Sequence, residues 1–480
     1  MINSRVANSA ATLFIGAAVA TVYAQDKTPP APPAAGPGLV NTWLRQQSEA
    51  FKPWDLGGQV RVRYEIFDKG PSFDFPTRDF QSHGADNENA YLLVREKVHL
   101  GYAPTAWGSA FVEARDSSST GDSNAKNPGA DQLDLHQGYI SLGQPGACPA
   151  SLKVGRQEFI YGDERLVGNS DWGNTARVFD AAKARLSFKD TWVDFFSSRV
   201  ILVDNHNFNM PNDYDWFSGV YASTRALVPF QQTEAYVLAR DTAAGSLKAN
   251  AGGSPDSAGA GPRDILSVGV RFQSLPGKLG AWDYTVEAVG QLGSVNNGAK
   301  RVDQEAQALA ASGGYTWKEA FGSPRVGIEY DFSSGDSDPK DGVSHTLDNL
   351  FPTNHKHYGT MDLVGWRNMH DLRGSFSLKP AKGLSVTVDY HSFWLADTRD
   401  YFYPQSGGGR SGLGYGLNPG YSNYLGSELG LEASYSVTKW STVRLGCGHF
   451  FAGDYVKQSK ASVGGAVDAN WFYSQIVVNF

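Results

Sequence analysis

The segment Gln59-Val-Arg-Val-Arg-Tyr-Glu-Ile66 alternates strictly between polar and apolar side chains. Its even positions, from Val60 to Ile66, are apolar, whereas its odd positions carry Gln, Arg, Arg and Glu. A β-strand turns successive side chains to opposite faces. The segment therefore predicts a strand with one apolar surface and one charged surface.

The same alternation recurs along the chain. The apolar sets that share one face are Leu266/Val268/Val270/Phe272, Trp282/Tyr284/Val286/Ala288, Val326/Ile328/Tyr330/Phe332, Leu384/Val386/Val388/Tyr390 and Leu429/Leu431/Ala433/Tyr435/Val437. The 54 glycines and an aromatic content of 12% also favour strands, because glycine weakens helices and aromatic residues prefer strands. Glu96 breaks the pattern, since it shares a face with Val94 and Val98. Either that strand is shifted or Glu96 lies near an interface.

Composition and charge exclude several classes of protein. Two cysteines cannot build a disulfide scaffold or a cysteine-rich metal cluster. A formal net charge of −7 provides no global basic field for nucleic acid. After the N-terminal residues, no run of 18 apolar residues predicts a transmembrane helix.

Two architectures use strands with one apolar and one charged face. A soluble sandwich buries the apolar face against a second sheet, whereas a membrane barrel turns it toward lipid. The charged faces favour the barrel, because Arg61, Arg63 and Glu65 in succession suit a water-filled interior. Tryptophans near the strand ends suit the membrane interfaces; they are Trp107, Trp192, Trp282, Trp317, Trp440 and Trp471.

Connections between the predicted strands are of two lengths. The segments 103–107, 379–383 and 438–439 are short, whereas 117–131, 243–262, 333–358 and 397–425 are long and rich in Gly, Asp, Ser and Asn. We expect an all-β fold, a single antiparallel transmembrane β-barrel of about 18 strands (16–18), with short periplasmic turns and long extracellular loops. Loops 333–358 and 397–425 are the expected gates.

The two ends of the chain carry further signals. Residues 1–24 have one basic residue, a short apolar stretch and small residues before position 24, which predicts a secretory signal peptide. Residues 25–52 form a Pro-rich spacer, in which Leu39 to Phe51 makes either an amphipathic helix turn or a lead into the first strand. The barrel is expected over 53–480. Its last strand places Phe472, Ser474, Ile476, Val478 and Phe480 on one face, which resembles the C-terminal signature of bacterial outer-membrane barrels.

Two dense motifs resemble the alginate-export porin family. The first is Val154-Gly-Arg-Gln-Glu-Phe-Ile-Tyr-Gly-Asp-Glu-Arg-Leu166, continued by Asp171-Trp172, Asn174, Arg177 and Asp180. The second is Leu350-Phe-Pro-Thr-Asn-His-Lys-His-Tyr-Gly-Thr-Met-Asp-Leu-Val-Gly-Trp-Arg-Asn368. The resemblance covers most of the mature chain. It implies a monomeric barrel of about 18 strands whose arginine-lined lumen passes an anionic uronate polysaccharide outward across the bacterial cell outer membrane.

Arginine suits such a lumen, because it is always ionised and can engage carboxylates bidentately. By alternation, the expected wall cations are Arg61, Arg63, Arg95, Lys97, Arg115, Arg185, Arg199, Arg240, Arg271 and Arg444. The resemblance adds Arg156 and Arg177 as pore-lining cations, with Asp163, Asp171 and Asp180 as their expected partners and Arg367 as a further inward residue. Each of these arginines could instead belong to a salt-bridge network that only stiffens the wall.

Other constellations give weaker signals. Asp336-Ser-Asp-Pro-Lys-Asp-Gly342 resembles a calcium loop but departs from the EF-hand spacing. His355 and His357 could meet a metal on a strand face, and Asp163 with Glu164 could serve as glycosidase carboxylates. The sequence leaves open whether Cys148 and Cys447 form a disulfide.

Three functions are therefore compared. The leading hypothesis is a non-enzymatic channel for an anionic polysaccharide, with outer-membrane lipid and periplasmic export machinery as further partners and with no cofactor, metal or nucleic acid. The second is a general or small-solute uptake porin. The third is a glycan-active outer-membrane or secreted enzyme.

Overall fold

The computed structural model describes residues 38–70, 79–84, 86–123, 129–145, 147–243, 262–297 and 300–480. The predicted signal peptide, most of the Pro-rich spacer and most of loop 243–262 lie outside the described residues, so those expectations stay predictions.

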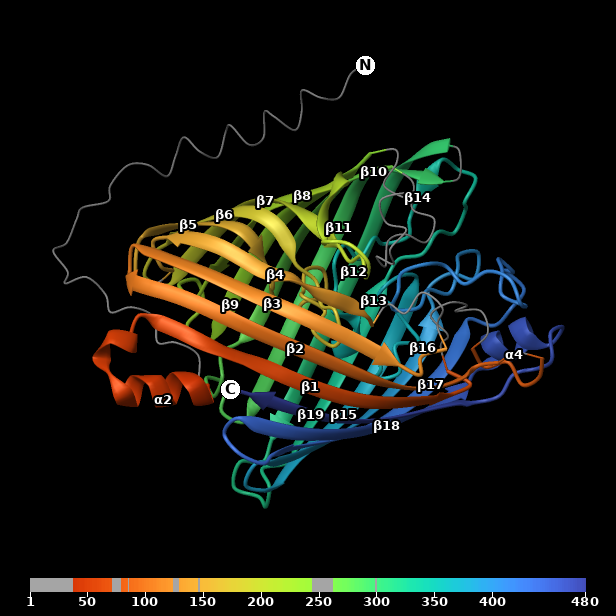
Figure 1. Cartoon of the computed structure of the whole chain (residues 1–480). Helices are drawn as coiled ribbons and strands as arrows, with labels where there is room; N and C mark the ends of the chain where they lie inside the picture. The colour runs from red at the N-terminus through yellow and green to blue at the C-terminus, as the bar shows by residue number, and fades with distance from the viewer. Residues whose placement is uncertain are drawn as a thin grey trace.

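The described chain forms one sheet that closes on itself as a barrel (Figure 1). Its strands are β1 (Trp54–Asp68), β2 (Glu88–Thr105), β3 (Gly108–Thr120), β4 (Asp131–Leu142), β5 (Ala150–Gln157), β6 (Phe179–Ser187), β7 (Thr191–Leu202), β8 (Met210–Thr224), β9 (Gln231–Thr242), β10 (Arg263–Ser274), β11 (Trp282–Asn297), β12 (Lys300–Thr316), β13 (Arg325–Ser333), β14 (Val343–Ser344), β15 (Met369–Ala381), β16 (Leu384–Leu395), β17 (Tyr424–Ser436), β18 (Ser441–Ala452) and β19 (Ala469–Asn479). β14 is a two-residue strand within a loop and pairs in parallel with β12. The other 18 strands form the closed antiparallel barrel, which confirms the predicted fold.

The barrel closes where its first strand meets its last. β1 pairs with both β2 and β19, and Val60 lies opposite Val478. The C-terminal residue completes the seam, because Gly58 and Phe480 exchange backbone hydrogen bonds of 3.1 and 2.9 Å. The terminal segment that resembled an outer-membrane signature is thus the strand that closes the sheet.

The two faces of the wall differ as the alternation predicts. Apolar side chains point outward, as the exposed fractions of Val98 (58%), Ile140 (62%) and Ile328 (63%) show. Arg61, with 3% exposure, points inward instead. Glu96 is exposed on the outer face in unshifted register with Val60, so the strand is not displaced there.

The length of the connections distinguishes the two ends of the barrel. At the short-turn end, β2 joins β3 through residues 106–107 and β15 joins β16 through residues 382–383. At the long-loop end, the connections include residues 158–178, 334–368 and 396–423, together with a segment that contains helix α4 (Asp454–Lys460). The predicted alternation of short and long links is therefore confirmed.

Two of the long connections fold into the interior of the barrel. We call residues 158–178 and 345–368 together the plug. Their backbones are joined, since the Phe351 amide donates to the Leu166 carbonyl (2.9 Å) and the Gly168 amide donates to the Phe351 carbonyl (2.8 Å). Leu347, Phe351 and Trp366 are buried in the main apolar cluster, which therefore lies at the long-loop end of the bore.

Three local expectations are now settled. Residues Leu39–Gln47 form a helix, α2, whose side chain Asn41 contacts Asp55 and the Leu56 amide at the start of β1. The apolar residues of this segment recur at helical rather than strand spacing, which explains why the segment forms a helix and not a lead into the first strand. Cys148 is buried and Cys447 is exposed, and both are free thiols. In the part of the chain that the structure describes, no helix has the length and apolar character needed to cross a membrane.

Candidate functional site

Five cations line the inner face of three neighbouring strands, and we call them the basic ladder: Arg61, Arg63, Arg95, Lys97 and Arg115. All five are buried. Arg61 lies directly opposite Arg95, and Lys97 lies directly opposite Arg115. Like charges directly opposite one another destabilise a sheet, so this arrangement needs compensating acceptors.

The first set of acceptors is the backbone of the plug. Arg61 donates to the carbonyls of Asp171 (2.6 Å) and Gly173 (2.9 Å), and Arg63 donates to that of Trp172 (2.7 Å). Arg95 also donates to the Asp171 carbonyl, at 3.1 Å. Three guanidinium groups thus hold three consecutive carbonyl oxygens of the plug against the inner wall of the barrel.

Carboxylates provide the second set of acceptors. Arg63 pairs with Glu65 (2.7 Å), and Arg95 pairs with Asp171 (2.8 Å). Arg115 pairs with Asp131 on β4. Burial alone would raise the pKa of the Asp171 carboxyl, but Arg95 and Lys97 outweigh it and lower that pKa below its ordinary value. Asp171 is therefore ionised near neutral pH.

An aromatic ring sits against the ladder. The Arg63 guanidinium lies 3.7 Å from the centroid of the Trp172 ring, and the imidazole of His355 stacks on that ring at 3.8 Å and 9°. His355 also contacts Asp362 at 2.9 Å. These contacts join the ladder to both segments of the plug.

Other predicted cations hold the plug from the opposite wall. Arg271 pairs with Asp163 (2.7 Å) and with Glu234 (2.8 Å). Arg240 pairs with Asp215 (2.5 Å) and donates to the Leu350 carbonyl (3.2 Å).

The two predicted cations within the plug bind backbone oxygens of the loops. Arg177 donates to the Gly168 and Pro352 carbonyls at 3.0 and 2.9 Å. Arg367 donates to the Gly407 carbonyl at 2.7 Å, and its guanidinium lies 4.6 Å from the ring centroid of Tyr403.

Two predicted wall cations lie on the outer face of their strands. Arg199 shares its strand face with the exposed Phe195, pairs with Asp213 (2.6 Å) and stacks on Trp216. The alternation argument placed it inward, but the consecutive Phe195 and Phe196 put apolar residues on both faces of β7, so alternation does not orient this strand.

Arg156 shares its face with the exposed Leu152 and Val154. It pairs with Asp180 (2.9 Å) on the neighbouring strand and donates to the Asn209 carbonyl (3.0 Å). The family resemblance therefore named an arginine and an aspartate that contact one another, but on the outer side of the sheet.

Two predicted cations lie on the inner face toward the short-turn end. Arg185 pairs with Asp194 at 2.5 Å and stacks on Trp192. Arg444 is exposed on the same strand face as the buried Gly446 and Gly448.

The sequence argument missed several cations inside the bore, among them Arg165, Arg263 and Lys153. Arg165, in the plug, pairs with Asp331 (3.1 Å) and Glu329 on β13 and donates to the Tyr358 hydroxyl (2.9 Å). It lies in the first family motif, but such a loop residue has no periodicity to show which way it points.

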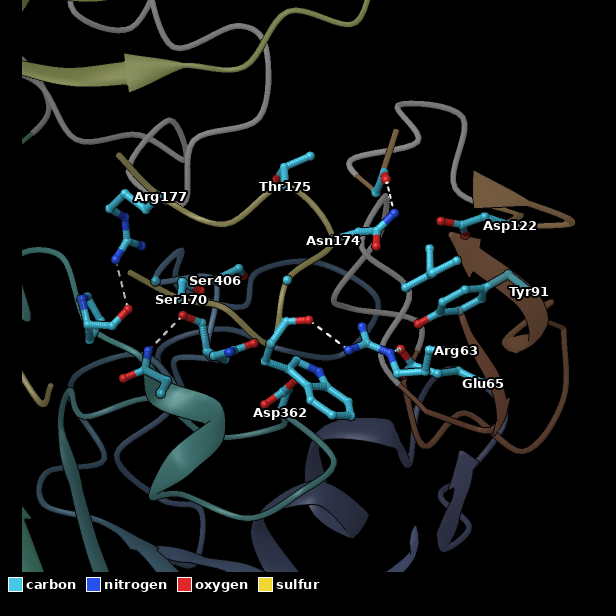
Figure 2. Close-up of a pocket in the computed structure, with 18 of the residues that line it drawn as sticks. Arg63, Glu65, Tyr91, Asp122, Ser170, Asn174, Thr175, Arg177, Asp362 and Ser406 are labelled. Atoms are coloured by element: carbon cyan, nitrogen blue, oxygen red, sulfur yellow. Dashed lines mark hydrogen bonds and ion pairs between the residues drawn. The ribbon is translucent and has the colours of Figure 1, made fainter. Parts of the chain in front are cut away.

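A cavity of about 220 Å³ opens between the ladder and the loops. Arg63 and Glu65 line it from the wall, and Ser170, Asn174 and Arg177 line it from the plug (Figure 2). Asn174 fixes this part of the plug, since its amide donates to the carbonyls of Val94, Ser118 and Gly129. The cavity thus combines these polar groups with apolar ones such as Tyr91 and Leu93, and the segment that the ladder holds lines part of it.

The weaker motifs take other positions. His355 and His357 lie at a 3-10 turn rather than on a strand, and the His357 ring contacts the Asp163 carbonyl at 2.7 Å. Asp163 binds Arg271, whereas Glu164 binds Thr353 and Lys356. Within the described ranges, no group of three or more His, Cys, Asp or Glu side chains is arranged to hold a metal ion.

The carboxylates of the acidic loop 336–342 bind its own backbone. Asp336 accepts from the Asp338 amide (3.1 Å), and Asp341 accepts from the Val343 amide (2.8 Å).

Solved barrels with the same fold are distant in sequence. The chain is similar to OccAB1 of Acinetobacter baumannii, with 11% identity and a TM-score of 0.54 over 89% of this chain and 97% of that one. It is also similar to OccD3 (OpdP) of Pseudomonas aeruginosa, with 12% identity and a TM-score of 0.54 over 89% and 91% of the two chains. A third, OccK2 (OpdF) of Pseudomonas aeruginosa, was solved in complex with glucuronate, with 10% identity and a TM-score of 0.51 over 89% and 98%.

The family comparison is more specific than the fold. No curated protein matches the chain in sequence. The model of the family described as alginate export matches residues 52–470, which is nearly the whole barrel. The chain belongs to the alginate-export family.

Proposed function

We propose that this protein is an outer-membrane channel that passes an anionic, alginate-like polysaccharide outward along the basic ladder. Membership of the alginate-export family supports a channel and argues against an enzyme. The observation that carries the proposal is the use of three ladder arginines to hold bare backbone oxygens of the plug.

The chemistry of a polyuronate suits these donors. Each sugar carries one carboxylate, and a carboxylate accepts two parallel hydrogen bonds from a guanidinium. A carbonyl oxygen is neutral, so a charged carboxylate is the stronger acceptor for a guanidinium. A uronate that enters the bore therefore competes with residues 171–173 for Arg61, Arg63 and Arg95.

The plug must move for a polymer to pass. Its carbonyls occupy the ladder on one wall, while Asp163 holds Arg271 on the other. Each of these charge-assisted contacts contributes about 1.5–3 kcal/mol at most, so they exchange readily with substrate carboxylates one at a time. On this proposal Asp163 and Asp171 are the plug's own carboxylates, which stand in for those of the substrate.

The orientation of the barrel follows from its two ends. We assign the short-turn end to the periplasm, where export machinery would deliver the polymer, and the long-loop end to the cell exterior. The exposed apolar band, with Val98, Ile140 and Ile328, then contacts outer-membrane lipid.

One observation favours a second candidate, an uptake porin for small anionic solutes. The cavity of about 220 Å³ beside Arg63 and Arg177 is large enough for a small solute but not for a polymer. The Occ barrels share the fold, and the one solved with glucuronate is a precedent for a sugar acid in such a barrel.

Current block in planar bilayers tests the proposal. The purified chain is expected to conduct, and an oligouronate of several units should block the current, while a neutral oligosaccharide of equal length should not. A monomeric uronate that blocks as well as the oligomer would favour the small-solute porin. Equal block by neutral and acidic oligomers would contradict both candidates, and hydrolysis of the oligouronate would favour an enzyme.

A further inference from the structure

A second group of inner side chains lies nearer the short-turn end than the ladder. His99 on β2 stacks on Phe111 on β3, with centroids 5.4 Å apart and planes at 27°. Phe111 stacks in turn on Tyr139 on β4 at 5.2 Å and 20°. The ammonium of Lys153 on β5 lies 3.5 Å from the centroid of the Tyr139 ring. Four consecutive strands thus contribute one continuous row.

The row faces the bore. His99 has the same parity on β2 as the buried Lys97, and Phe111 has the same parity on β3 as the buried Glu113. The side chains of the row are only partly buried, so they border the lumen rather than a packed core. Gly155 lies directly opposite Tyr139 and places no side chain beside its ring, so the Lys153 ammonium two residues away can lie over it. The positive φ of Gly155 (125°) also disfavours any side chain there.

A second lysine extends the row onto β6. Lys183 lies directly opposite Lys153, and its ammonium lies 5.3 Å from the ring centroid of Phe159. In the described part of the chain, neither lysine forms an ion pair with a carboxylate, in contrast to Arg63, Arg95 and Arg115 of the ladder.

The acids near the lysines are already engaged. Asp194 binds Arg185 and the Tyr161 hydroxyl. Glu158 binds His136, Lys97 and Asn169. Two ammonium groups directly opposite each other repel, and a bound anion would remove that cost.

We infer that this row is a second sugar-acid subsite, in which the lumen-facing edges of His99, Phe111 and Tyr139 border a hexuronate ring and Lys153 and Lys183 receive its carboxylate. The inference rests on the proposed function, because it assumes a uronate in the bore. It adds a separate position on the path, since His99 lies four residues beyond Arg95 along β2, or roughly 13 Å.

The two halves of the subsite do different work. Aromatic rings pack against the C–H face of a sugar whether or not it is charged, so they hold the polymer without selecting its charge. The lysines select the acid. Lysine is a flexible point charge rather than a planar fork, which favours transient contact with a moving carboxylate.

Asymmetric block of the full-length barrel in planar bilayers tests the subsite, with trigalacturonate as the probe added to one side at a time. In the double variant Lys153→Gln/Lys183→Gln, the residence time of the block from the short-turn side should fall roughly tenfold, as expected for two ammonium–carboxylate contacts of up to about 1 kcal/mol each. Block from the long-loop side should stay at the wild-type value. The matched control Lys382→Gln/Lys439→Gln removes two charges from turns at the same end and should change neither.

Two further variants complete the test. Lys153→Arg/Lys183→Arg should retain the block, and Phe111→Leu/Tyr139→Leu should shorten the residence of trigalacturonate. Wild-type block with unchanged residence in the glutamine variant would overturn the subsite alone. Absence of block from either side in the wild type would overturn the proposed function as well. If the glutamine variant fails to insert into the bilayer, the arginine and leucine variants test the subsite instead.

Discussion

Arg61 and Arg95 lie directly opposite one another on β1 and β2, and both guanidinium groups donate to the same backbone carbonyl, that of Asp171. Two like charges are thus held together by an oxygen that is 110 residues from Arg61 and 76 residues from Arg95 in sequence. The wall and the plug are therefore mutually dependent: the plug lies in the bore because the ladder holds it, and the ladder is tolerated because the plug neutralises it.

Removal of the two arginines should loosen the plug. In Arg61→Met/Arg95→Met, partly buried carbonyl oxygens lose their donors, which costs at most about 1–3 kcal/mol for each group left unsatisfied. We expect a larger and noisier single-channel current and a lower unfolding temperature, measured by the heat-dependent gel shift of the barrel. The control Arg199→Met removes an outer-face arginine and should alter neither; a quiet, wild-type current in the double variant would contradict the dependence.

The opposite anchor of the plug gives a second test. Asp163→Asn removes the carboxylate that Arg271 holds at 2.7 Å while keeping the size of the side chain. We expect more frequent transitions between current levels, because the plug loses one of its charged contacts with the wall. Asp213→Asn breaks the exposed pair with Arg199 on the outer face and should leave the current trace unchanged. Identical traces from both variants would show that this anchor has no role in holding the plug.

Alternation predicted well which face of each wall strand points into the bore, because the sequence of a strand by itself shows which of its faces is apolar. Gln59 to Ile66 and the terminal segment near Phe480 were assigned correctly, since a strand that faces lipid on one side and water on the other must alternate. The same reasoning failed for Arg199, because the consecutive Phe195 and Phe196 put apolar residues on both faces of β7. It could not orient Arg156 either, which was named by resemblance and not by pattern.

The plug could not be predicted, because its contacts join distant parts of the chain. Nothing local to Asp171 indicates that its carbonyl meets Arg61, and nothing local to Arg165 indicates a partner on β13. The loops favoured as gates were 333–358 and 397–425. The first of these contributes to the plug, but its partner, residues 158–178, was assigned only as a motif.

The stability that the ion pair of Asp171 contributes has a defined dependence on pH. Arg95 and Lys97 lower the pKa of Asp171 in the folded protein, so its ion pair contributes stability that is fully present above the unfolded carboxyl value of about 3.9. That contribution is lost as the pH falls through the lower folded value. We expect a steady current from pH 7 to about pH 4 and increased plug motion below it, in bilayer recordings. Asp171→Asn should show the increased motion already at pH 7; a transition near pH 6 in the wild type that Asp171→Asn removes would contradict this assignment.

The seam of the barrel offers a test of the fold. A Cβ added to Gly58 would lie 2.2 Å from the Lys97 carbonyl oxygen and 2.5 Å from the Phe480 ring, whereas one added to Gly374 meets nothing within 4 Å. Gly58→Ala should therefore destabilise the closed barrel by about 1–3 kcal/mol. Gly374→Ala, on a mid-strand position of β15, should be neutral. Equal unfolding temperatures for the two variants would argue against the β1–β19 closure.

The central claim is that the bore selects anions through cations on its inner wall, and the reversal potential of the wild-type channel under a KCl gradient tests it most directly. The account predicts a potential of the sign that marks chloride as the more permeant ion, reduced toward zero in Arg61→Gln/Arg95→Gln. A potential of the opposite sign in the wild type, which marks potassium as the more permeant ion, would contradict it.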